Sequence, residues 1–163
     1  MPPIPTAIAI CLATAALEGI CAGTKVKPFF ASLRFPRYSA PLWVWSIIGA
    51  CYYLIFGYVL YRVLRLDHTS GLKSVTIALV VAMMMINAVT NYVIFRARDL
   101  KRAFVIGAIF PFFDVLLLAL LLKLDASASI VLIPYLMYRI YAVYWGYALW
   151  KANPGTDEGP AHS

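Results

Sequence analysis

Five long apolar runs, separated by short polar connections, dominate the sequence. Each run is close to the roughly 20 apolar residues that a helix needs to cross a bilayer. The pattern therefore predicts an all-α integral membrane protein, a five-helix transmembrane domain over residues 1–151. The predicted spans are residues 4–22, 42–63, 72–95, 103–122 and 128–150. Residues 23–41 form a long first loop, and residues 152–163, which are polar and rich in proline and glycine, are expected to be a disordered tail.

Composition supports the membrane assignment. Apolar residues make up 63% of the 163 residues, and charged residues make up only 13%. Soluble domains are about 45–50% apolar, and a chain of this length cannot hide so much apolar surface by itself. Lipid is therefore the expected solvent for most of the surface, and membrane lipids are expected partners.

The net charge of +7 lies in the short connections, so no basic face for nucleic acid is expected. Lysine and arginine near span ends accumulate on the cytoplasmic side. This rule places the first loop, the third loop and the C-terminus in the cytoplasm, with the N-terminus on the opposite side. The cations of the predicted cytoplasmic side are Lys25, Lys27, Arg34, Arg37, Arg96, Arg98, Lys101, Arg102 and Lys151. Fewer lie on the other side, namely Arg62, Arg65, Lys73 and Lys123.

The sequence predicts neither a metal site nor a catalytic residue. The cysteines Cys11, Cys21 and Cys51 fall inside apolar runs, and their odd number does not indicate a disulfide framework. His68 lies in a connection, where a solvated side chain is expected. No nucleophile has a neighbouring base, and no covalent cofactor is expected.

Three ionisable residues, Glu18, Asp114 and Arg139, lie inside predicted spans, where a charge is costly and usually meets a partner or a cavity. Asp114 and Arg139 lie at similar distances on either side of the turn between the last two spans, so they reach a similar depth. We predict a buried ion pair between them. Either the pair only fixes how the two helices pack, or Arg139 is free to meet an anionic ligand.

Asn87 and Asn91 lie one turn apart in the third span, at the depth of Glu18 and just under the first loop. Amide side chains in a membrane either bond helices together or orient a ligand in an apolar pocket. The shared depth of the three side chains favours a cavity at this level.

The last span places polar and aromatic residues on one face. Tyr135, Tyr138, Arg139 and Ala142 follow Pro134 at positions i, i+3, i+4 and i+7. One interpretation is interface anchoring and core packing. The other is that these tyrosines lie too deep for an aromatic belt and need partners for their hydroxyl groups.

Small residues recur at four-residue spacing in two spans and allow close approach of helices. They are Ala15, Gly19 and Gly23 in the first, and Ala78 and Ala82 in the third. They serve either packing within the bundle or a homodimer seam.

Several motifs resemble the TspO/MBR family, the tryptophan-rich sensory proteins that include the mitochondrial translocator protein, also called the peripheral benzodiazepine receptor. The segment Leu132-Ile133-Pro134-Tyr135-Leu136, followed by Tyr138, Tyr141 and Ala142, is similar to the family signature LxPYxxW..FA. Residues 33–41 resemble the family's LxKPxWxPP loop, with Pro36, Tyr38 and Pro41 in matching places. Residues 53–57 resemble LYxxMG, and Asn87 with Tyr92 and Phe95 resembles NxxWSxxFF.

The resemblance implies a pocket for porphyrins, sterols or benzodiazepine-type drugs, capped by the first loop. A haem-type tetrapyrrole is then a possible ligand. Carried over position by position, the pocket residues are Pro36, Tyr38, Pro41, Tyr53, Asn87, Tyr135, Tyr138 and Ala142. Glu18, Asn91 and Arg139 join this set from the analysis of polar residues above.

The chain resembles a divergent, tryptophan-poor branch, because Gly49, Thr90 and Tyr138 stand where the family usually has tryptophan. Gly49 in place of a bulky ring is expected to enlarge the pocket. The leading hypothesis is binding of a flat apolar ligand, with a sensory or transport role. The alternatives are a tetrapyrrole-degrading enzyme, a dimeric scaffold for partner proteins and an unrelated small transporter.

Overall fold

The computed structural model describes residues 2–66 and 71–154, which form six helices and no strand. Five helices are long and apolar enough to cross a membrane, which confirms the predicted fold class. These five are α1 Pro3–Ala22, α3 Leu42–Leu64, α4 Gly71–Phe95, α5 Leu100–Leu124 and α6 Ala126–Ala152. Their ends lie within three residues of the predicted spans. His68, predicted to be solvated, lies outside the described residues.

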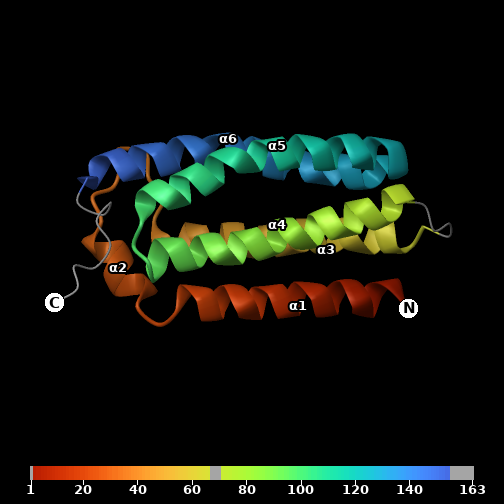
Figure 1. Ribbon diagram of the computed structural model, residues 1–163, viewed down its shortest axis with the longest axis horizontal. Helices are drawn as coiled ribbons and strands as arrows, with labels where there is room; N and C mark the ends of the chain where they lie inside the picture. The colour runs from red at the N-terminus through yellow and green to blue at the C-terminus, as the bar shows by residue number, and fades with distance from the viewer. Residues whose placement is uncertain (1, 67–70, 155–163) are drawn as a thin grey trace.

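The long helices form a closed ring in the order α1, α4, α5, α6, α3, with a further contact between α3 and α4 across it. In Figure 1 they stack as three layers: α1 alone, then α3 with α4, then α5 with α6. The first loop, the α4–α5 connection and the last turn of α6 lie at one end of the bundle, together with α2 (Figure 1). We call this end the α2 end.

The first loop is not irregular throughout, because α2 spans Val26–Ser32 within it. The sequence does not predict this helix, because seven residues are too few to show an apolar period. Phe29 of α2 and the following Leu33 are buried against Leu100 and Leu149, at the start of α5 and the end of α6. The loop is therefore docked across the end of the bundle.

The predicted tail also begins with ordered residues. Ala152 belongs to α6, and the Asn153 amide Nδ2 donates to the carbonyl oxygens of Arg34 and Leu149, at 2.9 and 2.8 Å. The Arg34 N–H donates to Asn153 Oδ1 at 2.9 Å, which makes a two-way bond between the tail and the first loop. Residues 155–163 of the predicted tail lie outside the described residues.

Helix ends follow from individual residues. Gly23 ends α1 with φ of 73°, a conformation that favours glycine, and a Cβ there would lie 2.9 Å from Arg96 Nε. Asp99 caps α5 by accepting from the Arg102 N–H at 2.8 Å. Asp125 is the single residue between α5 and α6, and its side chain accepts from the Ala128 N–H at 2.8 Å.

The turn at Asp125 is tied to α3 as well. Nε and Nη2 of Arg62 both donate to Asp125 Oδ2, at 2.9 and 2.7 Å, and the Asp125 side chain is only 7% exposed. Burial raises the pKa of the Asp125 carboxyl. Hydrogen bonds from the Arg62 guanidinium and the Ala128 N–H outweigh that effect and hold the pKa below its ordinary value.

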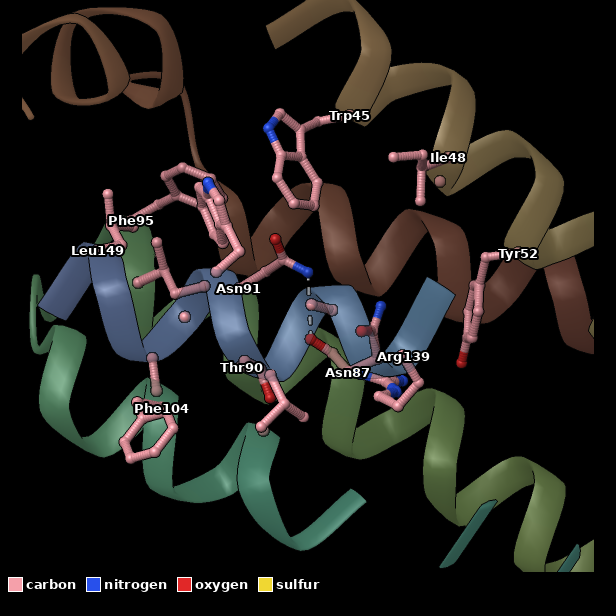
Figure 2. A pocket seen from close by; sticks show the side chains of 18 of the residues that line it. Trp45, Ile48, Tyr52, Asn87, Thr90, Asn91, Phe95, Phe104, Arg139 and Leu149 are labelled. Atoms are coloured by element: carbon pink, nitrogen blue, oxygen red, sulfur yellow. Dashed lines mark hydrogen bonds between the residues drawn. The ribbon is translucent and has the colours of Figure 1, made fainter. Parts of the chain in front are cut away.

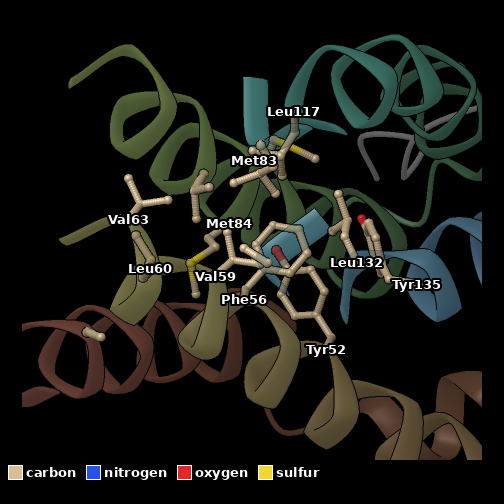
Figure 3. Packing of buried hydrophobic residues seen from close by; sticks show 14 of the residues in the cluster. Tyr52, Phe56, Val59, Leu60, Val63, Met83, Met84, Leu117, Leu132 and Tyr135 are labelled. Atoms are coloured by element: carbon tan, nitrogen blue, oxygen red, sulfur yellow. The ribbon is translucent and has the colours of Figure 1, made fainter. Parts of the chain in front are cut away.

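The packed core occupies the half of the bundle away from the α2 end. Its fully buried side chains come from α3, α4, α5 and α6, and Figure 3 shows how they pack against one another. Among the largest are Phe56, Val59, Leu60, Met83, Met84, Leu117, Leu121 and Leu132. At Gly57, α1 comes so close to α3 that a Cβ would lie 3.2 Å from Cys11 Sγ. This tightly packed half gives the other half a fixed frame.

Replacing Asp125 by Ala should destabilise the protein, because α6 loses its N-cap and Arg62 loses its partner. The cap alone is worth about 1 kcal/mol. A carboxyl whose pKa is lowered by folding stabilises the protein above its unfolded-state pKa of about 4 and loses this effect as pH falls through the folded value. Thermal unfolding in detergent should therefore show a lower midpoint for the variant at pH 7 and a smaller difference from the parent near pH 3.

Asp99→Ala is the matched control, since Asp99 also caps a helix but pairs with Arg102, whose side chain is 81% exposed. It should cost less than Asp125→Ala. Equal losses for the two variants would contradict a stabilising tie between the α5–α6 turn and α3.

Candidate functional site

A cavity of about 250 Å³ lies inside the half of the bundle nearer to α2. All six helices contribute to its wall, and Figure 2 shows side chains from α3, α4, α5 and α6 around it. The wall is mainly apolar and aromatic. Among these lining side chains are Phe30, Leu33, Trp45, Ile48, Phe95, Phe104 and Leu149. An apolar wall with a few polar groups is the usual character of a small-molecule site.

Residues without large side chains create this space. Gly49 on α3 and Gly107 on α5 both line the cavity, and a Cβ built on either would have no neighbouring atom within 4 Å. A Cβ on Gly146 of α6 would lie 3.8 Å from Phe104 Cδ2, in ordinary contact. Thr90 of α4 lines the cavity as well. The positions at which the resembled family carries tryptophan are therefore partly open here.

Glu18 of α1 joins three side chains from two other helices. Its Oε2 accepts from the Tyr53 hydroxyl of α3 at 2.6 Å and from the Asn87 amide of α4 at 3.1 Å. Its Oε1 accepts from the Asn91 amide at 3.0 Å. Asn91 also donates to the backbone oxygen of Asn87 at 3.1 Å, the bond drawn in Figure 2. Because Tyr53 and both amides donate to the same carboxylate, this cluster links α1, α3 and α4 beside the cavity.

Arg139 of α6 lies on the cavity wall at its deeper end and pairs with Asp114 of α5. The distance from Arg139 Nε to Asp114 Oδ2 is 3.2 Å, and the two side chains are 12% and 2% exposed. The predicted ion pair is therefore present. Arg139 Nη2 also donates to the Tyr135 hydroxyl, and the guanidinium carbon lies 4.4 Å from the ring centroid of Phe110.

The ion pair has unfilled hydrogen-bonding capacity. Neither Asp114 oxygen accepts a well-aligned hydrogen bond within the described residues, and Arg139 Nε donates none. The Tyr52 hydroxyl, from another lining residue that is 7% exposed, is also unpartnered there. Unfilled buried polar atoms are costly, so this end of the cavity can accept further polar partners.

The mouth of the cavity is held by hydrogen bonds between the first loop and an aromatic cluster. Trp45 Nε1 donates to the Ala40 carbonyl at 3.0 Å, and Trp145 Nε1 donates to Ser39 Oγ at 2.8 Å. The two indole rings lie 4.4 Å apart between centroids. The Tyr141 hydroxyl donates to the carbonyl oxygen of Tyr38 at 2.9 Å. The loop is thus fastened to α3 and α6 over the opening.

Many of the residues predicted to bind a ligand line the cavity together. They are Glu18, Asn87, Asn91, Tyr135, Tyr138, Arg139 and Ala142. The four on α6 lie at the spacing noted in the sequence, so one helical face carries them.

The other predicted ligand residues are not part of the lining. The Tyr53 hydroxyl binds Glu18 from the side. Pro41 is the N-cap of α3, and Pro36 is half-buried in the loop. Tyr38 is 72% exposed, so its contribution at the mouth is its backbone carbonyl.

Several lining residues could not be predicted from the sequence. Trp45, Phe104, Gly107 and Trp145 were not candidates, because a single aromatic or glycine in an apolar span gives no sign of which way it points. The one available signal was the spacing of Trp145 from Tyr138 and Tyr141, which places it on the same face of the last span.

The small-residue stripes mostly face outward. Gly19, Ala78 and Ala82 are exposed, and Ala15 is half-buried. Gly23 has the separate role of ending α1. The exposed stripes are open to lipid or to a partner, and the predicted homodimer stays a prediction.

Comparison with known proteins settles the family. The TspO/MBR family model matches residues 7–151 of the sequence, nearly the whole chain. The chain belongs to the TspO/MBR family. No curated protein matches it. Membership in the TspO/MBR family agrees with the motifs in the first loop and last span, and with the five-helix membrane bundle. No cluster of three or more His, Cys, Asp or Glu side chains able to hold a metal occurs in residues 2–66 and 71–154.

Replacing Glu18 by Leu should destabilise the bundle, because three donors on α3 and α4 lose their acceptor. Interhelical hydrogen bonds in membranes average about 0.6 kcal/mol each, so the expected loss is about 2 kcal/mol. Unfolding in detergent measures it. Glu18→Gln, which keeps one acceptor oxygen, should recover part of the loss. An unchanged midpoint for Glu18→Leu would leave the cluster without a structural role.

Proposed function

We propose that this TspO/MBR-family protein binds a flat, largely apolar molecule that carries a carboxylate, in the cavity at the α2 end. A tetrapyrrole acid is the leading class, and a sterol-like lipid with an acidic group is a second. The observation that carries the proposal is a guanidinium on the wall of an otherwise apolar cavity. Arginine binds carboxylates through a planar fork and keeps its charge in every environment.

The rest of the wall suits a flat ring. Trp45, Tyr138 and Trp145 present aromatic faces or edges to the cavity, and Phe95 and Phe104 line it from α4 and α5. Aromatic rings stack in offset or edge-on arrangements that stabilise flat partners. These residues would hold the ring system while Arg139 orients its acid group.

The cavity is small for the proposed ligand, so its volume limits how a ligand can enter. About 250 Å³ is slightly below the range of roughly 300–1,000 Å³ typical of small-molecule sites. A tetrapyrrole therefore requires the first loop to move, and the hydrogen bonds of Ser39 and Ala40 to the two tryptophans are the contacts that must open. Such a loop movement would couple ligand binding to a sensory or transport role.

The proposed orientation places the α2 end in the cytoplasm. The support for it is the excess of lysine and arginine on that end, in the first loop, the α4–α5 connection and the last turn of α6. A ligand would then enter from the cytoplasmic leaflet or the cytoplasm.

Arg139→Leu should weaken binding of protoporphyrin, because the acid group loses its charged partner. A charge-assisted hydrogen bond is worth about 1.5–3 kcal/mol, or roughly 10- to 150-fold in Kd. The measurement is quenching of tryptophan and tyrosine fluorescence on titration in detergent. Protoporphyrin dimethyl ester, which has no charge, should bind both proteins alike.

Two further variants make this test specific. Arg37→Leu removes the same charge from the exposed part of the first loop and should leave both affinities unchanged. Arg139→Met combined with Asp114→Leu removes both buried charges, which avoids an unpaired carboxylate if Arg139→Leu folds poorly. Equal weakening of acid and ester by the double variant would reduce Arg139 to a packing role.

Gly49→Phe should abolish binding of both acid and ester, because the new ring enters open space in the cavity. The helix backbone should accept a side chain here, since a Cβ at position 49 meets no atom within 4 Å and glycine is a poor helix residue. Thermal unfolding in detergent checks that the variant folds. Gly19→Phe adds the same ring on the outward face of α1 and should leave ligand binding intact. Retained ligand affinity in Gly49→Phe would exclude this cavity as the site.

A further inference from the structure

The Arg139 guanidinium lies between the cavity and the Asp114 carboxylate. Its side chain forms part of the cavity wall, whereas Asp114 is 2% exposed and is not among the lining residues. The carboxylate therefore meets the guanidinium from behind, on the α5 side. Figure 2 shows Arg139 beside Tyr52 and Asn87 at the deep end of the cavity. A ligand carboxylate would meet the same guanidinium from the cavity side.

The Arg139–Asp114 pair itself is neutral, with one cation and one anion. Other ionisable groups near the pair are Tyr52, Tyr138 and Tyr135, and the Tyr135 hydroxyl accepts from Arg139. From α1, Glu18 lines the same cavity and is bonded to its own donors. From α4, the lining residues at this level are the uncharged Asn87 and Asn91. Among the described residues, Arg139 is therefore the cation that balances Asp114.

Two carboxylates within the membrane spans, Glu18 and Asp114, are held in different ways. Glu18 of α1 accepts three hydrogen bonds, from Tyr53, Asn87 and Asn91, so its charge is spread over fixed donors. Asp114 has Arg139 at 3.2 Å and the neighbouring Tyr135, but no well-aligned hydrogen bond to either oxygen. Its ionised state thus depends mainly on the charge of Arg139. A ligand carboxylate paired with Arg139 would weaken the stabilisation of ionised Asp114 by the guanidinium.

We propose that binding of an organic carboxylate to Arg139 is coupled to uptake of one proton by Asp114. This inference rests on the proposed function, since it concerns the same cavity and the same ligand class. The ligand carboxylate pairs with the guanidinium, and a proton from solvent binds a carboxylate oxygen of Asp114. No covalent bond of the ligand forms or breaks. The net charge of the cavity does not change, because one anion and one proton enter together.

Charge balance is the physical reason for the coupling. Two carboxylates sharing one guanidinium would leave a net negative charge in an apolar, membrane-buried place, where an uncompensated ion is costly and takes up a proton instead. The site is therefore proton-linked, and it prefers a single carboxylate at its deep end. If the protein moves its ligand across the membrane, one acid group crosses together with one proton, and the two together carry no net charge.

Affinity for the acid should rise as pH falls. For one proton taken up, the affinity changes about tenfold for each pH unit, in the range where Asp114 is ionised in the free protein and protonated in the complex. A ligand without an acid group brings no second anion and should bind with the same affinity across this range.

Titration calorimetry of the purified protein in detergent, at pH 7 in phosphate and in Tris, counts the protons exchanged. Protoporphyrin and its dimethyl ester are the probes. We expect uptake of about one proton per protoporphyrin and none per ester. Binding of protoporphyrin without proton uptake would overturn the inference and leave the proposed function standing. No saturable binding of either probe would overturn both.

Asp114→Asn identifies the group that takes up the proton. It should bind protoporphyrin without proton uptake and with an affinity independent of pH between about 6 and 8, since its amide does not titrate. Glu18→Gln changes the other carboxylate of the cavity wall and so separates the two candidate proton acceptors; proton uptake should persist in it even if its affinity for the acid differs from that of the parent. Uptake that persists in Asp114→Asn, or that disappears only in Glu18→Gln, would contradict the assignment. If Asp114→Asn does not fold, the double variant Arg139→Met with Asp114→Leu should bind the acid more weakly than the parent does and without proton uptake; proton uptake in this variant would contradict the assignment.

Discussion

A charged or amide side chain at membrane depth must find its partner inside the protein, because lipid tails offer none. This constraint organises the cavity half of the bundle. Glu18 brings α1 to α3 and α4 through three hydrogen bonds, and Asp114 with Arg139 brings α5 to α6. The two polar contacts involve all five spans, so the walls of the cavity are positioned by the same groups that give it polarity.

The two halves of the bundle differ in how tightly they are packed. Away from α2, large apolar side chains such as Phe56, Leu60 and Leu117 are fully buried and leave little freedom. Toward α2, glycines at 49 and 107 leave open space between the same helices. Tyr52 and Tyr135 lie at the boundary and belong to both the packed core and the cavity wall. The packed half can therefore hold the polar groups of the cavity wall in place.

The five spans were predictable from the sequence because lipid demands long apolar runs, and this signal is hard to mistake. The Asp114–Arg139 pair was predictable because two opposite charges lie at equal depth in helices joined by a short turn. The helix α2 was not, since its seven residues are stabilised by contacts of Phe29 with residues remote in sequence.

Some site residues were likewise predictable from the sequence, and others were not. Spacing on one helix identified Tyr135, Tyr138, Arg139 and Ala142, whose neighbours follow from the helical period. The roles of Tyr38 and Trp145 depend on how a loop folds back over another helix, which no local pattern encodes. The resemblance to a family supplied the loop motif, and the structure places its backbone, rather than the Tyr38 ring, at the mouth of the cavity.

The turn at Asp125 restricts how this sequence can change. One residue ends α5, begins α6 and binds Arg62, so the connection has no slack to absorb an added or missing residue. A one-residue insertion or deletion between position 114 and the turn would rotate Asp114 by about 100° around its helix. Asp114 would then face away from Arg139. The length of the hairpin between the two charges therefore cannot change by a single residue without separating them.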